Sequence, residues 1–345
     1  MRALELIELG DPTISPGREG SPFRIVEDAE PPMEPPPGMI VLRVAAGAIN
    51  FADLLVIGGT YQEKPPLPYV PGSECSGTVV AVGEDVEHLA VGDKVTAVAS
   101  FGGGFSEQAL VMADAAVKLP ASLSEERLEQ AAGLLVAAGT AWLAVHERGQ
   151  LRAGETLLVL GAAGGVGVFT VQLGKLAGAR VVAVARGADK CALLKKLGAD
   201  AVIDSSTLGP GGLRQAISEA APQRIDVIFD PVGGQACQDA LRCVNLAARL
   251  LVIGFAAGVP KVPLNVALVK NLTIHGVYWG QYATFRPAVY QESLREVARL
   301  YGEGKLVVPV SHVFRLEEIG QGMAAIKERK VVGKAIVLPG KGAKI

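Results

Sequence analysis

The chain has 345 residues, of which half are hydrophobic, 20% are charged, 42 are glycine and 5% are aromatic. This length allows two domains with a core each, and many glycines with few aromatics are typical of parallel α/β proteins. The net charge of −2 gives no basic surface, so no nucleic-acid partner is expected. No apolar run approaches ~20 residues and the N-terminus has no signal-peptide pattern, which predicts a cytoplasmic protein without a membrane partner.

The pattern of strand-like and helix-like segments changes near Ser124. Before it, short β-like runs such as MIVLRVAAGAIN are separated by proline and glycine, which predicts an antiparallel β-rich domain. After it, strands alternate with helices, and six strand-like runs begin at Leu157, Arg180, Asp200, Ile225, Arg249 and Leu272. This alternation predicts a doubly wound parallel sheet in the order 3-2-1-4-5-6. The tail from about Arg286 has two helical stretches and a strand-like GKAIVLP, and we expect it to fold back on the first domain.

The first strand of this series, Leu157–Leu160, runs into the glycine-rich turn Ala162-x-Gly164-x-x-Gly167 and an apolar-periodic helix. Small residues permit the tight turn and let the backbone approach a pyrophosphate, whose charge the N-terminus of a helix favours. This context predicts a dinucleotide-binding turn. A purely structural turn is the alternative, because any tight connection between strand and helix favours glycine.

The end of the second strand bears on the choice between NADPH and NADH. Where an NAD enzyme places an acidic residue for the ribose 2′-hydroxyl, this chain has Arg186-Gly187, and Lys190 follows one turn into the next helix. Because cations attract a 2′-phosphate, the expected cofactor is NADPH. The alternative is that both residues are ordinary solvated charges.

Neither the cysteines nor the histidines form a metal-binding pattern. The four cysteines are scattered without a C-x-x-C pair, and the four histidines show neither metal spacing nor a catalytic motif, so no metal ligand is predicted. The C-terminal Ala343-Lys344-Ile345 loosely resembles a peroxisomal address. Peroxisomal targeting is therefore the alternative to a cytoplasmic location.

Several short motifs are spread from about residue 39 to 338. They are Asn50-Phe51-Ala52-Asp53, Gly59-Thr60-Tyr61, PYVPGSECSGTVVAVGEDV, VGDKV, GAAGGVG, DPVGG and VIGFAAG. Together they resemble the motifs of the medium-chain dehydrogenases/reductases, and above all of their zinc-free quinone oxidoreductase (zeta-crystallin-like) branch. The resemblance implies an α/β protein with a GroES-like β-rich catalytic domain in two pieces and a Rossmann domain. In this chain they are expected at residues 1–122 and 283–345 and at residues 123–282, with the active site in the cleft between them and a homodimeric assembly.

Departures from the zinc alcohol dehydrogenases of this superfamily point to the reaction. Those enzymes take a zinc ligand from the loop occupied here by Asn50–Asp53 and another from the position of Ser73, and neither ligand is present. Their structural-zinc lobe is replaced by Ala99–Gly104. Without a Lewis acid, alcohol oxidation loses its main charge stabilisation, whereas a conjugated acceptor delocalises the incoming charge. We therefore expect an NADPH-dependent reductase that transfers hydride to a small hydrophobic quinone.

Two other functions stay open at this point. An alkenal or enone double-bond reductase would use the same fold and cofactor and differ only in the atom that accepts the hydride. A crystallin-like protein that binds NADPH with little turnover belongs to a different class.

The resemblance also implies three catalytic residues. Asn50 would donate to a developing oxyanion or orient the nicotinamide, Tyr61 would bond a carbonyl oxygen, and Thr140 would lie beside the nicotinamide ring. The proton would come from water or Tyr61, and Asp53 would keep its loop in shape. The structural alternatives are an Asn that stabilises a turn and a tyrosine that packs in the core.

The expected cofactor contacts extend beyond Asn50, Thr140, Arg186 and Lys190. The others are Ala163, Gly164, Gly165, Val166, Ser205, Ile253, Gly254, Phe255, Arg329 and Lys334. Ser205 can bond a phosphate but cannot stack on the cofactor as an aromatic residue would. Arg329 and Lys334 have solvated charges at a helix end as their alternative interpretation.

Overall fold

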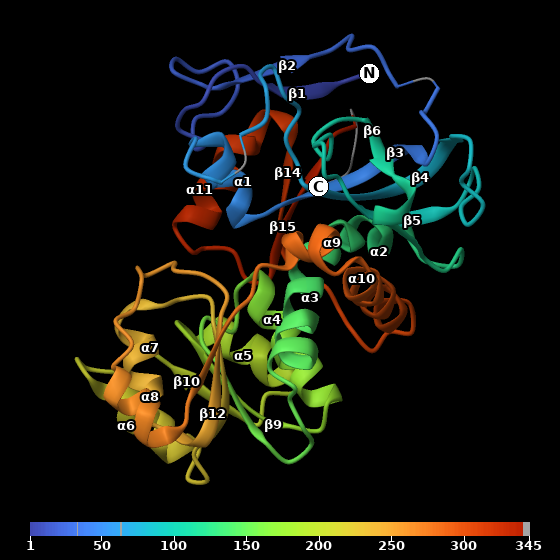
Figure 1. The fold of residues 1–345 in the computed structure, drawn as a ribbon. Helices are drawn as coiled ribbons and strands as arrows, with labels where there is room; N and C mark the ends of the chain where they lie inside the picture. Colours follow the sequence, from blue (N-terminus) through green and yellow to red (C-terminus); the bar gives the residue numbers. More distant parts are fainter. Residues whose placement is uncertain (33, 63, 341–345) are drawn as a thin grey trace. The chain divides into compact units, whose positions relative to one another are not determined.

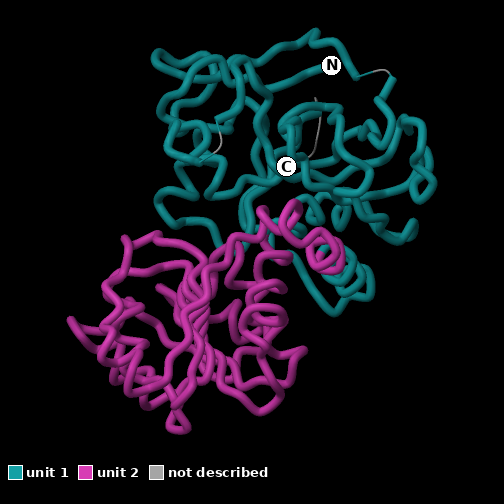
Figure 2. Tube along the Cα trace, viewed as in Figure 1, with its two compact units in different colours: residues 1–136, 294–345 teal, residues 137–293 magenta. Residues whose placement is uncertain are grey.

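The computed structural model describes residues 1–32, 34–62 and 64–340, and the chain divides into two compact units (Figure 2). Unit 1 is Met1–Val136 with Leu294–Ile345, and unit 2 is Ala137–Ser293. Both boundaries lie further along the chain than the expected 122 and 283. The reason at the first boundary is that the segment after Ser124 is tied to the sheet of unit 1. The tripeptide Ala343–Ile345, on which the peroxisomal alternative rests, lies outside the described residues.

Unit 2 is built on a parallel six-stranded sheet with the order β10-β9-β8-β11-β12-β13. Strands β9, β10 and β12 are labelled in Figure 1. The strands of the sheet are β8 (Thr156–Val159), β9 (Arg180–Ala185), β10 (Ala201–Asp204), β11 (Ile225–Asp230), β12 (Val244–Val252) and β13 (Thr273–Gly276). Counted along the chain, this is the order 3-2-1-4-5-6, so the predicted doubly wound topology is confirmed. Strand β12 begins earlier than the expected Arg249.

Helices separate these strands and bury the sheet. They are α3 (Leu135–Trp142), η3 (Leu143–Arg148), α4 (Gly165–Leu176), α5 (Ala188–Lys196), α6 (Gly212–Ala220), α7 (Gly234–Leu241), α8 (Leu264–Lys270), η4 (Trp279–Gln281) and α9 (Tyr282–Phe285). Ile217 of α6 and Leu241 of α7 pack with Leu158, Ile228 and Leu250 in one core. Continuous apolar strands such as β8, whose four residues are all buried, suit a sheet covered on both faces.

Unit 1 contains a larger, mostly antiparallel sheet and a two-stranded one. The large sheet has the order β14-β15-β3-β4-β5-β7, with β6 also paired to β3. Its strands are β14 (Val310–Arg315), β15 (Lys334–Leu338), β3 (Met39–Ile49), β4 (Glu74–Val82), β5 (Lys94–Val98), β7 (Ala116–Lys118) and β6 (Gln108–Met112), and the small sheet has β1 (Ala3–Leu6) and β2 (Phe23–Val26). Because β15 pairs with β3, the C-terminal tail folds back on the first part of the chain, as the sequence predicts.

The helices of unit 1 are short except for α10, which begins in unit 2. They are α1 (Phe51–Ile57), η1 (Ala113–Ala115), α2 (Glu125–Gln130), η2 (Ala131–Gly133), α10 (Pro287–Gly302), η5 (Leu316–Glu318) and α11 (Ile319–Lys327). The hydroxyls of Ser76 and Thr96 donate to the carbonyls of Leu128 and Ala131, which fixes α2 and η2 to β4 and β5.

Helix α1 corrects the expectation of a loop at Asn50–Asp53. Asn50 is its N-cap, and the backbone N–H of Asn50 donates to Oδ2 of Asp53 at 2.7 Å. An Asn followed three residues later by an acidic side chain favours a helix start, a signal that the sequence contained. The predicted loop residues therefore form a rigid first turn.

No single helix among the described residues combines the length and apolar character needed to cross a membrane. One pair, Glu125–Gly133 and Leu135–Arg148, would meet both criteria together, but it is bent by 56°.

Candidate active site

The glycine turn of unit 2 has the backbone geometry that a dinucleotide requires. Gly161 has φ +58°, and a Cβ on Gly167 would lie 2.6 Å from the carbonyl oxygens of Gly161 and Ala162. Gly164, the extended N-cap of α4, has no side chain that could bond the helix N-terminus. The first N–H groups of a helix have no partner within it, so this turn offers donors to a pyrophosphate. These residues fit a nicotinamide dinucleotide.

The predicted cofactor residues of unit 2 gather at the carboxyl ends of its parallel strands. The N–H of Leu160 donates to Phe229 at 3.0 Å and the N–H of Ile253 donates to Asp230 at 2.9 Å, so the ends of β8, β11 and β12 are in register. The chain reverses its strand order between β8 and β11, which is where ligands bind in open α/β sheets. Ile253, Gly254 and the half-exposed Phe255 follow β12 at this edge.

The Arg186 loop contains a charge that sequence reasoning missed. Arg186 is exposed after β9, but Asp204 at the end of β10 accepts from the N–H of Gly187 at 2.9 Å. Bonds from Ser206 and Gly187, together with the Arg186 charge, lower the pKa of Asp204. The hydroxyl of Ser205 donates to the carbonyl of Ala185 at 3.0 Å, so it must leave that bond to reach a phosphate.

Unit 1 contains a buried network of polar side chains around Asn50. The Lys334 ammonium donates to Oδ1 of Asn50 at 2.6 Å and to Oε1 of Glu74 at 2.9 Å. Nδ2 of Asn50 donates to the same Glu74 oxygen at 2.9 Å, and Oε2 of Glu74 accepts from the N–H of Val136 at 2.9 Å. The side chains of Lys334 and Glu74 are only 2% and 0% exposed, so this ion pair is shielded from water.

A second carboxylate, Asp53, extends the network. Burial raises the pKa of Asp53 to about 6 and the Glu74 charge adds to the effect, although the bond from Asn50, the Lys334 charge and a bond from Ser73 oppose it. The Ser73 hydroxyl also lies 3.4 Å from Nδ2 of Asn50. Burial and the charge of Asp53 raise the pKa of Tyr69 to about 12.

The Lys334 side chain packs closely against a neighbouring glycine. A Cβ on Gly133 would lie 2.8 Å from Cε of Lys334, so a glycine lets η2 pack against this side chain. The interpretation of Lys334 as a solvated charge at a helix end is therefore wrong. Its expected contact with a cofactor phosphate would require the ammonium to share its donors with Glu74 and Asn50.

The remaining predicted residues are separated by the division into units. Tyr61 is half-buried just after α1, and its N–H donates to Leu55 at 3.1 Å. Thr140 lies in the second half of α3 and belongs to unit 2, and Arg329 is exposed after α11 with φ 59°. The structure thus brings Asn50 together with Lys334 but adds Ser73 and Glu74, which sequence reasoning had not assigned to the site. The sequence did contain one signal for Glu74, because a charged residue at the start of an otherwise apolar run indicates a buried charge with a partner.

Comparison with known proteins shows the same two regions. Residues 36–121 match the alcohol dehydrogenase GroES-like domain family and residues 165–299 match the zinc-binding dehydrogenase family. A quinone oxidoreductase-like protein 2 homolog of Nematostella vectensis is 36% identical over 310 residues, which are 87% of this chain and 82% of the relative. The chain belongs to the medium-chain dehydrogenase/reductase superfamily. Its relatives place it in the quinone oxidoreductase-like branch.

Solved structures of the superfamily have the same fold as this chain. An Escherichia coli quinone oxidoreductase complexed with NADPH has a TM-score of 0.84 and 26% identity, with 98% of this chain and 100% of that chain covered. An NAD-dependent alcohol dehydrogenase has a TM-score of 0.86 and 27% identity, with 99% and 100% covered. The chain is accordingly an oxidoreductase of the medium-chain type with a nucleotide-binding Rossmann unit.

The name of the matched zinc-binding family does not fit the donors in unit 1. Of the two places that hold catalytic zinc ligands in the alcohol dehydrogenases of this superfamily, one is the segment Asn50–Asp53, which contains no cysteine or histidine, and the other is Ser73. The buried ammonium of Lys334 lies 2.6 Å from Oδ1 of Asn50 and would repel a divalent cation. Across the described residues, no three His, Cys, Asp or Glu side chains are grouped so that they could hold a metal.

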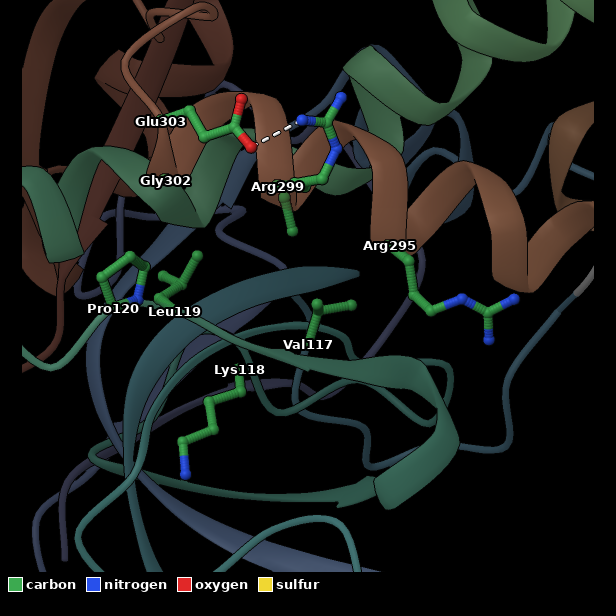
Figure 3. Close-up of a pocket in the computed structure, with 9 residues that line it drawn as sticks. Val117, Lys118, Leu119, Pro120, Arg295, Arg299, Gly302 and Glu303 are labelled. Atoms are coloured by element: carbon green, nitrogen blue, oxygen red, sulfur yellow. Dashed lines mark hydrogen bonds and ion pairs between the residues drawn. The ribbon is translucent and has the colours of Figure 1, made fainter.

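An open pocket elsewhere on unit 1 contains none of the predicted site residues (Figure 3). It is lined by Val117, Lys118, Leu119, Pro120, Arg295, Ala298, Arg299, Gly302 and Glu303. The Arg299 side chain at its edge is paired with Glu303, so its charge is compensated there.

Proposed function

We propose that this protein is an NADPH-dependent, zinc-independent reductase that transfers hydride to a small hydrophobic quinone. The observation that supports it most is the buried Lys334 ammonium, bonded to Asn50 at 2.6 Å where zinc-dependent relatives would hold a metal. When bound, NADPH supplies two electrons and one hydrogen as a hydride. The protein's own task is then to bind both partners, exclude water and provide a proton.

The cofactor is held by unit 2 in this proposal. The amides of Ala163, Gly165 and Val166 bond the pyrophosphate. Gly164, whose own N–H donates to the carbonyl of Gly161 at 3.0 Å, lets the backbone approach it, and Ile253, Gly254, Phe255 and Thr140 meet the nicotinamide side. Arg186 and Lys190, with Ser205, bind the 2′-phosphate, although Asp204 reduces the attraction. Arg329 is proposed as a further phosphate contact.

The acceptor meets unit 1 at Tyr61 and beside Asn50. Both groups of the Asn50 amide already have partners, so we assign Asn50 to positioning rather than to donation. A quinone suits this site because it spreads the incoming charge over a conjugated ring and needs no Lewis acid. An enone shares that property and is the second substrate class to test.

Rapid mixing of the NADPH-loaded protein with quinones, enones and saturated aldehydes tests the proposal. We expect loss of NADPH absorbance with quinones and formation of the hydroquinone. Turnover of enones alone would move the function to double-bond reduction. Tight NADPH binding without turnover of any acceptor would favour the crystallin-like function.

A homodimer is also proposed, through the free edge of the unit 2 sheet. Among the described residues β13 ends the sheet, and α8, which contacts the neighbouring β12 and precedes β13 in the chain, has no buried residue. Leu264, Leu268 and Val269 of α8 are each more than two-thirds exposed, and Ile274 of β13 is 44% exposed. An exposed apolar helix and the last strand of a sheet are surfaces that a second copy can cover.

A single charge on this surface tests the dimer. We expect Leu268→Glu to convert the dimer to a monomer, because burying an unpaired carboxylate in an apolar interface is strongly unfavourable. Light scattering coupled to size exclusion measures the mass. The matched control is Leu176→Glu, an exposed leucine of α4, which should leave the mass unchanged. A monomeric wild-type protein would contradict the assignment.

A further inference from the structure

The Asn50 amide has no hydrogen left for a substrate. Nδ2 carries two hydrogens, and the acceptors within reach are Oε1 of Glu74 at 2.9 Å and Oγ of Ser73 at 3.4 Å. Oδ1 is bonded by Lys334 at 2.6 Å, which fixes the direction of the amide. A hydrogen for an acceptor oxygen must therefore come from a group other than Asn50.

Ser73 is the member of the network that can supply it. Glu74 and Lys334 are buried, whereas Ser73 is partly exposed at the residue before β4. Its oxygen lies 3.4 Å from Nδ2 of Asn50, whose backbone N–H donates to Asp53 at 2.7 Å, and a bond from the Ser73 hydroxyl is among the causes that lower the pKa of the Asp53 carboxyl. Since a hydroxyl has one hydrogen, an ionised Asp53 occupies it and a protonated Asp53 releases it.

The charges around Asp53 allow its carboxyl to be either protonated or ionised. The groups that face it are Lys334 from β15, Glu74 from β4, and Tyr69 and Ser73 from the segment that leads into β4. Burial raises the pKa of Asp53 to about 6, which is near the pH range in which a general acid works best.

We propose that the Ser73 hydroxyl donates the proton that the reduced acceptor requires, and that Asp53 resupplies it. Asn50, Glu74 and Lys334 position the hydroxyl. This inference rests on the proposed reductase function and names the proton source within it, replacing water or Tyr61.

The proton steps balance. The acceptor that has received a hydride carries one additional negative charge, and its oxygen takes the proton of Ser73 Oγ. The proton of the Asp53 carboxyl moves to Ser73 Oγ at the same time, and the Asp53 carboxylate then recovers one from solvent. The sum is quinone, NADPH and one proton giving hydroquinone and NADP⁺.

Replacement of Ser73 is the first test. We expect Ser73→Ala to lower kcat about 100-fold, the range for loss of a general acid, while the Kd for NADPH stays within about twofold. Ser73→Thr keeps a hydroxyl and should recover much of the rate. The matched control is Ser76→Ala in the adjoining β4, whose hydroxyl donates to Leu128 and whose loss should lower only the thermal midpoint.

Asp53→Asn is the second test and does not depend on the first variant folding. Wild-type kcat should fall as pH rises through about 6, because only the protonated carboxyl can resupply Ser73. Asp53→Asn should lose this limb. Infrared titration of the protein without substrate should show a protonated carboxyl band that disappears over the same range and is missing in Asp53→Asn.

The outcomes separate this inference from the proposed function. An active wild type with an equally active Ser73→Ala, or an unchanged pH limb in Asp53→Asn, would overturn the proton path alone. A wild type that oxidises no NADPH with any acceptor would overturn the reductase function and the proton path with it.

Discussion

The two units contribute different chemical groups to the proposed site: unit 2 contributes backbone N–H groups, and unit 1 contributes side chains. In unit 2 the glycine turn between β8 and α4 presents backbone N–H groups, and its residues are consecutive in the chain. In unit 1 the network joins side chains from α1, β4 and β15, and Asn50 and Lys334 are 284 residues apart. A site made of backbone is therefore visible in a short sequence pattern, whereas a site made of distant side chains appears only once the sheet is assembled.

The two sites also differ in what their loss would cost. The turn carries no charge, so a change there mainly affects space and ligand binding. The network holds an ammonium and two carboxylates away from water, where loss of one partner leaves a charge without compensation. Changes in the network should thus affect folding more strongly than changes in the turn.

The largest expected effect is that of Lys334→Met, which keeps the length of the side chain. It leaves Glu74 buried without its cation, and we expect a loss of about 3–5 kcal/mol in the free energy of unfolding. Urea denaturation measures it. The double variant Lys334→Met with Glu74→Gln should recover part of the loss, because it removes the orphaned charge; no recovery would contradict the pairing.

The second-largest expected effect is the pH dependence of the free energy of unfolding. The folded pKa of Asp53 is about 6, above its ordinary value, so its contribution is complete at acidic pH and is lost as pH rises through about 6. The loss amounts to about 3 kcal/mol from a shift of roughly two units. Unfolding at both ends of this range should show a smaller pH dependence in Asp53→Asn than in the wild type. Equal pH dependence in both would exclude a raised pKa.

A smaller effect is expected in the turn. In Gly167→Ala the new Cβ would lie 2.6 Å from two backbone oxygens, which should cost about 1–3 kcal/mol and weaken NADPH binding. Calorimetric titration and denaturation measure both quantities. Gly209→Ala is the control, since no atom lies within 4 Å of its Cβ, and it should change neither. An unchanged affinity in Gly167→Ala would show that the turn does not hold the cofactor.

The smallest effect is that of Arg186→Ala. Arg186 is exposed and shares its surroundings with Asp204, so we expect about a tenfold loss of NADPH affinity and little change for NADH. Fluorescence titration with both cofactors gives the ratio. Arg214→Ala, an exposed arginine of α6, should alter neither affinity. Equal losses for NADPH and NADH would refute the 2′-phosphate assignment.

The sequence predicted the parts of the molecule that rest on local patterns. The strand order of unit 2 and the turn from Gly161 to Gly167 follow from apolar runs, glycine spacing and alternation. The return of the tail to the first part of the chain was also predicted, but its partner strand was not. Helix α1 was missed although Asn50 and Asp53 carried its capping signal. Glu74 and Lys334 could not be paired, because nothing local indicates that β15 would pair with β3 and bring Lys334 to Asn50 and Glu74.

The most direct test of a zinc-independent quinone reductase is a single-turnover reaction of metal-stripped protein, loaded with NADPH and mixed with a small naphthoquinone in the presence of a chelator. We predict that NADPH is oxidised at the same rate with and without the chelator, and more slowly when the transferred hydrogen is deuterium. Oxidation that occurs only after zinc is added, or no oxidation with any quinone, would contradict a zinc-independent quinone reductase.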